Sequence, residues 1–231
     1  MRSARNLIVT ADDLGASDGV NRGIVDAHRH GVVTSASLMV HGAAAEDAGA
    51  LARRHPALAV GLHWDLDAGG VGRVPPDDRE AVRTELAAQI ERFERLVGRP
   101  PTHLDGHHHV HQRPDVAPIA RELAAQLGAP LRGDGSVTYI GGFYGQWEWQ
   151  VTDLRHVSVD FLCSILREEV VDEWTEIGCH PGYVTPGFES VYLHEREEEV
   201  RTLTDARVRD QIDALGIRLS SFADFAEVHA R

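Results

Sequence analysis

Acidic, imidazole and guanidinium side chains recur in this sequence at the ends of short apolar runs. Such runs are typical of buried strands, and α/β barrels carry their active residues where parallel strands end. One Asp with two His gives a mixed oxygen and nitrogen ligand set that leaves positions for water, which suits metal-assisted hydrolysis. The side chains concerned are Asp12 and Asp13 after the first predicted strand, His63 and Asp65 after the third, Asp105 and the run from His107 to His111 at the fourth, Arg132 at the fifth and His180 at the sixth.

Each of these positions has a second interpretation. Asp12 and Asp13 are also typical of residues that cap a helix, and a single His after a strand, such as His63 or His180, is often structural. Because adjacent residues point in different directions, one carboxylate of the Asp pair can bind a metal while the other handles a proton. The ligand types leave Zn, Mn, Co, Fe and Mg open, although imidazole favours the transition metals.

Histidine is concentrated in one short segment. Five of the 14 histidines lie between His103 and His111. His103 and Asp105 alternate along a predicted strand and so share a face, and His107, His109 and His111 would alternate likewise in an extended chain. They cannot all bind one ion, so we expect some of them to orient a ligating ring through its second nitrogen. An exposed polar loop is the alternative interpretation.

The charge composition excludes several kinds of chemistry. All 23 basic residues among the 231 are Arg, and with 36 acidic residues they give a formal charge of −13. A chain without Lys has neither a Schiff-base nucleophile nor the Lys of Walker-type and kinase-type phosphate sites. The negative balance argues against nucleic acid and anionic membranes as main partners. Cys163 and Cys179 cannot form a disulfide framework and the N-terminus has no signal-peptide core, so we expect a cytoplasmic protein without membrane insertion.

Strands and helices alternate along the chain. This order predicts a single-domain (β/α) barrel over residues 1–231 with about seven parallel strands. The first strand is not followed by a Gly-x-Gly-x-x-Gly motif, which argues against a dinucleotide-binding site. The expected strands are 7–10, 32–40, 58–63, 102–105, 130–132, 176–180 and 217–219. The expected helices are 18–31, 43–54, 78–97, 115–127, 159–170, 195–215 and 221–229. Residues 67–76 are expected to form a loop, and the aromatic-rich residues 133–150 an active-site loop.

Four motifs follow one another along the chain. They are Thr10-Ala11-Asp12-Asp13-Leu14-Gly15, Val60-Gly61-Leu62-His63, Thr102-His103-Leu104-Asp105-Gly106-His107-His108-His109-Val110-His111 and Gly178-Cys179-His180-Pro181-Gly182-Tyr183. Together they resemble the motifs of the YdjC-like family, which are carbohydrate deacetylases and include chitooligosaccharide and hopanoid-biosynthesis deacetylases. The resemblance implies a (β/α) barrel, a divalent metal such as Mg²⁺ or Zn²⁺, and removal of an acetyl group from an N-acetylated sugar or glycoconjugate.

The resemblance also implies a role for each matching residue. The implied metal ligands are Asp13, His63 and His107, the general base is Asp12, the general acid is His180, and Arg132 orients Asp12. The expected sugar contacts are Trp64, Asp105, Tyr144 and Trp147, with Trp149 as a further stacking surface. The expected partner is therefore an N-acetylated carbohydrate, and a homodimer is left open.

Three other activities are also open to this set of residues. A phosphoesterase on a similar barrel would favour further cations near the metal, of which Arg132 is the obvious one. A glycosidase would use paired carboxylates, with Asp105 as the catalytic acid. A non-catalytic protein that binds sugar or metal on the same scaffold would need neither a base at Asp12 nor an acid at His180.

Overall fold

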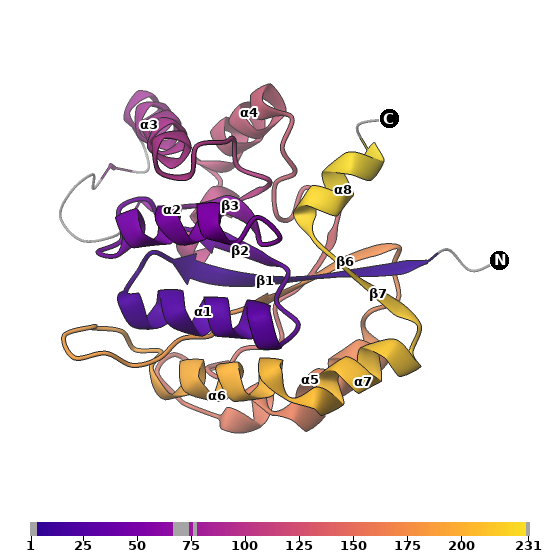
Figure 1. Ribbon diagram of the computed structural model, residues 1–231. Helices are drawn as coiled ribbons and strands as arrows, with labels where there is room; N and C mark the ends of the chain where they lie inside the picture. Colours follow the sequence, from indigo (N-terminus) through magenta and orange to yellow (C-terminus); the bar gives the residue numbers. More distant parts are fainter. Residues whose placement is uncertain (1–3, 67–73, 76–77, 230–231) are drawn as a thin grey trace.

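Seven parallel strands form one sheet in the computed structural model, which describes residues 4–66, 74–75 and 78–229 (Figure 1). The strands are β1 (Arg5–Leu14), β2 (Ser35–Leu38), β3 (Ala59–Trp64), β4 (Leu104–Gly106), β5 (Thr138–Ile140), β6 (Trp174–Cys179) and β7 (Ile217–Ser220). Their order is β4-β3-β2-β1-β6-β5, and β7 pairs with β1. The sheet forms a half-barrel, which confirms the predicted α/β fold with about seven parallel strands.

The central strand β1 aligns the ends of its neighbours. Residues 7–9 of β1 are buried, as expected for an apolar strand inside a parallel sheet. One edge of β1 pairs with β6, with Ala11 beside Cys179, so Asp12 and His180 follow at the same level of the sheet. The other edge of β1 pairs with β7 near its start and with β2 near its end. In the same way, the register of β3 against β4 sets the third and fourth strand ends level with each other.

The sheet beyond β4 differs from the sequence prediction. Residues 130–132 do not form a strand, because Leu131 makes only an isolated parallel bridge to Leu104. The fifth strand lies further along the chain, at β5, and pairs with β6. The bridge nevertheless holds Arg132 at the end of β4, because the Arg132 backbone N–H donates to the carbonyl of Leu104.

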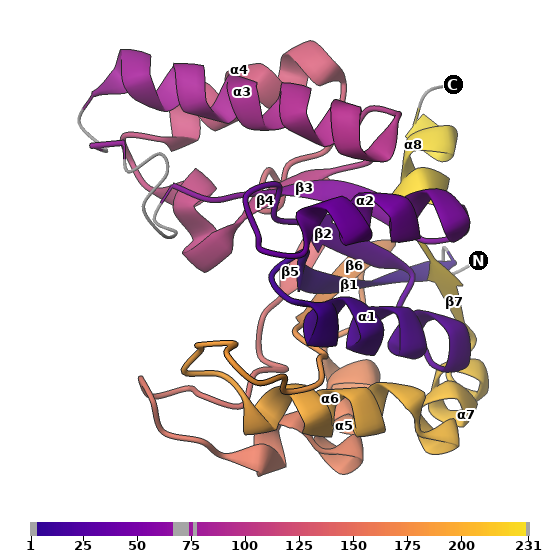
Figure 2. The same cartoon turned by 60° about the vertical axis from the view of Figure 1, so that its left-hand side comes forward.

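Helices lie on both sides of the strands. The α-helices are α1 (Asp18–His30), α2 (Ala45–Arg54), α3 (Arg79–Val97), α4 (Ala117–Leu127), α5 (Val159–Glu168), α6 (His194–Thr204), α7 (Ala206–Ala214) and α8 (Phe222–His229). Two 3₁₀ segments are η1 (His107–Gln112) and η2 (Leu154–Val157). In both views α3 and α4 lie on one side of the sheet, and α5, α6 and α7 lie on the other (Figures 1 and 2).

Local sequence signals explain where several helices begin and end. Ser17 caps α1 by accepting a hydrogen bond from the Val20 backbone N–H, and Asp78 caps α3 in the same way. Helix α3 ends at Gly98, which adopts a left-handed conformation with φ of 81° that an L side chain rarely takes. These helices therefore match the predicted helices closely.

Two other segments differ from their predictions. The single helix expected over 195–215 is broken into α6 and α7, because the extended Asp205 ends one helix and caps the next by accepting from the Arg207 N–H. The His run is not extended, since His108 and His109 adopt left-handed backbone conformations within η1. A positive φ at residues other than Gly costs energy. Such backbone strain is often found where the backbone positions functional side chains.

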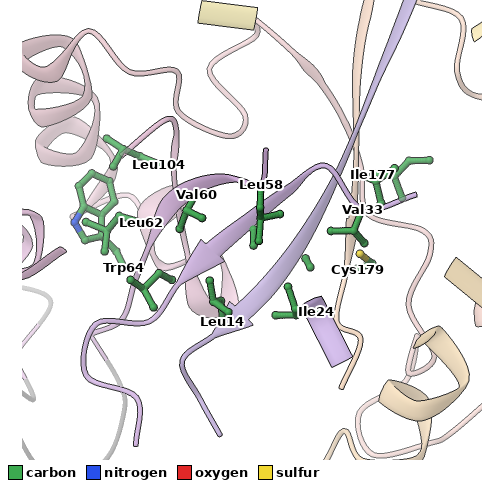
Figure 3. Close-up of a cluster of buried hydrophobic side chains, with 14 of the residues drawn as sticks. Leu14, Ile24, Val33, Leu58, Val60, Leu62, Trp64, Leu104, Ile177 and Cys179 are labelled. Carbon is green, nitrogen blue, oxygen red and sulfur yellow. The ribbon is translucent and has the colours of Figure 1, made fainter. Parts of the chain in front are cut away.

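Trp64 belongs to the hydrophobic core. The core cluster holds apolar side chains from the strands and the covering helices, and Figure 3 draws Trp64 in it together with Leu62 and Leu104. The Trp64 side chain is fully buried, and its indole N–H donates to the Leu86 carbonyl of α3. A sugar ring cannot stack on a side chain enclosed in this way, so the structure corrects the expected Trp64 contact.

Some sequence predictions concern the remaining parts of the chain. Most of the expected loop at 67–76 lies outside the described residues. Cys163 and Cys179 are both buried and unpaired, as expected for a chain without a disulfide framework. Among the described residues, no helix combines the length and apolar character needed to span a membrane.

Candidate metal centre and catalytic pocket

A cavity of about 500 Å³ opens where the strands end. Its size is typical of sites for small ligands. Seven of the predicted site residues line it, namely Asp12, Asp13, His63, His107, Tyr144, Trp149 and His180. The wall also includes three further aromatic side chains from β5, from the segment after it and from the segment before α6, namely Tyr139, Phe143 and Tyr192.

Asp13 and two imidazoles converge at one end of the cavity. Asp13 is the last residue but one of β1 and has a left-handed φ of 68°, which turns its side chain away from that of Asp12. Its Oδ1 lies 3.1 Å from His107 Nδ1 and 3.4 Å from His63 Nε2. The ligand atoms of the three residues all lie within 4.8 Å of one another. The structure thus brings together the three residues that the family resemblance implied as metal ligands.

Asp105 orients His63 from behind. The Nδ1 of His63 lies 2.7 Å from Asp105 Oδ1, so this carboxylate holds the ring with its other nitrogen, Nε2, facing Asp13. Ser37 Oγ donates to the other Asp105 oxygen at 2.7 Å. Histidine ligands of metals commonly donate their second N–H to a carboxylate in this way. Asp105 is fully buried and does not line the cavity, so the structure corrects the expected Asp105 contact with sugar.

The donor set fits a divalent metal. Two imidazoles and one carboxylate form a three-ligand set with positions left over, as in catalytic zinc sites. A second group that could hold an ion contains Asp12, His63 and Asp105. That group fits less well, because the Arg132 guanidinium already lies 2.7 Å from Asp12 and 2.8 Å from Asp105 and would repel a cation. Asp13, His63 and His107 are therefore the better candidates.

Charge keeps Asp13 ionised. Burial raises the pKa of the Asp13 carboxyl, but the Arg196 guanidinium and the imidazoles of His107 and His63 outweigh it and hold that pKa well below its usual value. A carboxylate that stays ionised is the form that binds a cation.

Arg132 holds three buried carboxylates at once. It forms two hydrogen bonds to Asp12, at 2.7 and 2.9 Å, and it also contacts Glu176 at 2.7 Å and Asp105 at 2.8 Å. Its guanidinium also lies over the ring of Tyr139. Burial raises the pKa of Asp12, yet the nearby Arg132 lowers it below the ordinary value. Asp12 is therefore ionised and held by a planar two-point contact.

Replacing Arg132 is expected to destabilise the fold strongly. An Arg132→Met variant leaves three buried carboxylates without their cation, and breaking a buried pair in this way costs about 3–5 kcal/mol. Urea unfolding measures the loss. Arg83→Met is a matched control, since Arg83 pairs with Glu122 on the surface, where ion pairs contribute little to stability. Similar losses in the two variants would contradict the role given to Arg132.

His180 lies beside Asp12 on the neighbouring strand end. Its Nε2 is 4.0 Å from Asp12 Oδ2, and its backbone N–H donates to Glu199 of α6. The ring packs edge-on against Tyr144 and Tyr192. Burial lowers the pKa of His180 to about 4, so the ring is neutral near pH 7 and is a strong proton donor once it has taken up a proton.

The aromatic residues predicted to contact sugar have different positions. Tyr144 lines the cavity and stacks in parallel on Tyr192 with ring centres 4.6 Å apart. Trp147 is not part of the cavity wall, because it stacks on His156 at 3.8 Å. Trp149, with 71% of its surface exposed, lines the cavity mouth. The structure therefore keeps Tyr144 and Trp149 as candidates for sugar contact and removes Trp147.

His103 supports the site indirectly. Its Nε2 lies 3.0 Å from Ser37 Oγ, the hydroxyl that donates to Asp105, and its ring stacks on Phe222 at 4.0 Å. Burial lowers the pKa of His103 to about 4. An unfolded His titrates near 6.5, so between these values the unfolded chain binds a proton that the folded chain does not, and stability falls as the pH falls.

This shift predicts a pH dependence that a single variant removes. From pH 7 to pH 4, His103 is expected to lower the free energy of unfolding by on the order of 3 kcal/mol. Urea unfolding of the wild-type protein and of His103→Gln at several pH values tests this. The variant is expected to lose less stability on acidification, and parallel curves for the two proteins would refute the prediction.

Sequence reasoning missed the residues that α6 contributes. Arg196 lines the cavity and donates to Asp13 Oδ2 at 2.6 Å, and the buried Glu199 contacts the backbone of His180. The segment from 195 to 201 contains four other charged residues and is typical of a solvated helix face. The available signal was the spacing of Tyr192, Arg196 and Glu199, which puts the three on one side of the chain.

The chain can also be compared with known proteins. A family model described as YdjC-like protein matches residues 6–214. The chain belongs to the YdjC-like family. This confirms the resemblance that the four motifs indicated.

Two relatives of this YdjC-like protein carry the same name. The chitooligosaccharide deacetylase of Serratia marcescens is 33% identical, with 94% of this chain and 98% of that protein covered. The chitooligosaccharide deacetylase of Salmonella paratyphi B is 36% identical, with 95% and 99% covered. A crystal structure from Enterococcus faecalis V583, of a protein suggested to cleave cellobiose phosphate, is 28% identical with a TM-score of 0.83, covering 96% of this chain and 99% of that one.

Proposed function

We propose that this protein is a metal-dependent hydrolase that removes the acetyl group from an N-acetylated sugar or glycoconjugate. The name of its chitooligosaccharide deacetylase relatives supports this class of substrate. The observation that carries the proposal is the division of tasks at the end of β1. Asp13 faces two imidazoles, whereas its neighbour Asp12 faces Arg132 and His180.

The metal would be held by Asp13, His63 and His107. When bound there, it would supply a Lewis acid that polarises the acetyl carbonyl and lowers the pKa of water. Two imidazole ligands favour a transition metal such as Zn²⁺ over Mg²⁺. Asp105 fixes the orientation of the His63 ring, so the site is already arranged for an ion.

Asp12 and His180 would move the protons. Asp12 is ionised, and the two-point contact with Arg132 fixes the plane of its carboxylate while each oxygen retains a lone pair for the attacking water. An amide nitrogen leaves poorly as an anion, so the breaking C–N bond needs a proton donor. Because His180 is neutral near pH 7, it would take up the proton that Asp12 removes from the water, across the 4.0 Å between His180 Nε2 and Asp12 Oδ2, and pass it to the leaving amine.

The walls of the cavity suit a neutral sugar. Tyr144 and Trp149 offer flat aromatic faces, and sugar rings present apolar C–H faces that pack on such rings. Among the described residues that line the cavity, the one Arg is Arg196, and it is already bound to Asp13. A neutral acetylated sugar needs no free cation to hold it.

Metal removal and acetate release test the proposal. The protein is stripped with a chelator and then supplied separately with Zn²⁺, Co²⁺, Mn²⁺ or Mg²⁺, and acetate is measured with a panel of N-acetylated mono- and oligosaccharides. The stripped protein is expected to release almost no acetate, and one or more metals to restore the activity. Equal acetate release before and after stripping would refute the metal requirement.

Cleavage of a phosphorylated disaccharide is the second candidate function. It is favoured by the suggested activity of the Enterococcus faecalis protein with the same fold. Phosphate recognition usually requires unpaired cationic groups, and Arg132 and Arg196 are both paired with carboxylates. Release of phosphate or glucose from cellobiose phosphate, without acetate from the acetylated panel, would decide for this second function.

A further inference from the structure

Helix α6 buries charged side chains on the face that it turns toward the site. Glu195, Arg196 and Glu199 are 1%, 4% and 0% exposed. Charged residues are almost never buried to this degree unless they are paired. Glu195 accepts hydrogen bonds from Gln146 and Thr152, and so fixes the aromatic loop after β5. Arg196 and Glu199 point instead to the residues of the catalytic pocket.

Every nitrogen of the Arg196 guanidinium has a defined acceptor. Nη2 donates to Asp13 Oδ2 at 2.6 Å, Nε to the Tyr192 carbonyl at 2.9 Å and Nη1 to the His180 carbonyl at 3.3 Å. The guanidinium also lies 5.7 Å from the ring centre of Phe188. These contacts fix the position of the cation relative to both strand ends, β1 and β6.

The two oxygens of Asp13 are therefore used differently. Oδ1 faces His107 Nδ1 and His63 Nε2, the atoms of the candidate metal centre. Oδ2 is occupied by Arg196 at a distance typical of a strong charge-assisted hydrogen bond. An ion that approached Oδ2 would have to displace this hydrogen bond and would lie close to a guanidinium of like charge.

We propose that Arg196 is a positioning residue that limits Asp13 to a single oxygen, Oδ1, for the metal. The inference rests on the proposed function insofar as it takes Asp13, His63 and His107 as the ligands. Asp13 without Arg196 would be free to bind the ion through both oxygens. A coordination position on the ion would thereby stay available to water and substrate. Because Arg196 lies on α6, this helix fixes how Asp13 meets the ion.

Cobalt binding in the absence of substrate tests the proposal. Visible absorption of bound Co²⁺ reports its coordination number, and it weakens as that number rises. Competition with a chelator gives the Co²⁺ dissociation constant. We expect Arg196→Met to give a weaker visible band than wild type and to bind Co²⁺ on the order of tenfold more tightly, because a like charge near the ion has been removed. Arg196→Lys, which keeps the charge and can still donate to Oδ2, is expected to restore the wild-type band.

Two further variants keep the result decisive. Arg196→Gln removes the charge with a shorter polar side chain and serves if the Met variant does not fold. Arg201→Met is the matched control, since Arg201 lies on the exposed face of the same helix and pairs with Glu197 and Glu198. We expect its cobalt band to match that of wild type.

The outcomes separate this inference from the proposed function. If wild type binds one Co²⁺ and the uncharged Arg196 variants give the same band and affinity, the positioning role is wrong, whatever the enzyme hydrolyses. If wild type binds no Co²⁺, the ligand set is wrong and the positioning role with it. If the band changes as expected but no acetylated sugar is hydrolysed, the proposed reaction fails and the role of Arg196 stands.

Discussion

An Asp12→Asn variant is expected to lose about 10²- to 10⁴-fold in kcat, the range that removal of a general base produces, while it keeps its metal. The substitution preserves the size of the side chain but removes its ability to accept a proton at neutral pH. Arg132 retains Glu176 and Asp105 as charged partners in the variant, so the buried cation is still compensated. Steady-state kinetics of acetate release and metal analysis of the same sample give both quantities.

Glu176→Gln is the matched control for this variant. Glu176 is a second carboxylate on Arg132, is equally buried, and does not line the cavity. Its replacement changes the same charge network without touching the reacting atoms, so we expect kcat to stay within a few-fold of wild type. If Asp12→Asn retained wild-type kcat, or if the two variants lost the same amount, Asp12 would not be the base.

A His107→Ala variant is expected to lose the metal. His107 supplies one of three ligand atoms and its side chain is 26% exposed, and the buried Asp13 keeps Arg196 as its partner when His107 is removed. Loss of a residue that merely orients a ligand costs about 10- to 100-fold in metal affinity, and we expect the loss of a ligand itself to exceed about 100-fold. Elemental analysis after gel filtration and acetate release measure the two consequences.

His109→Ala is the control for the His107 variant. His109 lines the same cavity and belongs to the same 3₁₀ segment, but it is not part of the cluster around Asp13. We expect His109→Ala to retain its metal. A full metal content in His107→Ala would remove His107 from the ligand set, and loss of metal from both variants would indicate a general disturbance of the segment.

The strand ends show what the sequence could predict. Apolar runs that end in Asp12, His63, Asp105 and His180 predicted both the strands and the side on which these residues meet. The prediction works because all parallel strands present their carboxyl ends at one edge, so the register alone brings the residues together. Arg132 lies in the site although residues 130–132 do not form the predicted strand. The parallel bridge of Leu131 to Leu104 places Arg132 as a strand would have done.

Trp64, Trp147 and Arg196 show what the sequence could not predict. In the sequence, an aromatic residue beside a candidate ligand looks the same whether it contacts sugar or packs in the core. Successive side chains of β3 point to opposite faces of the sheet, so Trp64 points away from His63 and into the core. Trp147 and Trp149 lie two residues apart in an irregular loop. Such a loop has no helical or strand periodicity from which one could predict which of the two faces the cavity. Arg196 lies in a charged run, and its burial arises only from the packing of α6 against the strand ends.

The product balance on N,N′-diacetylchitobiose tests the central claim most directly. Wild-type protein reconstituted with its preferred metal is incubated with this disaccharide, and acetate, free primary amine and new reducing ends are counted together. Hydrolysis of the amide predicts equal amounts of acetate and amine with the glycosidic bond intact. New reducing ends without acetate, or no product with this or any other N-acetylated sugar at any metal, would contradict the assignment of the pocket as a deacetylase site.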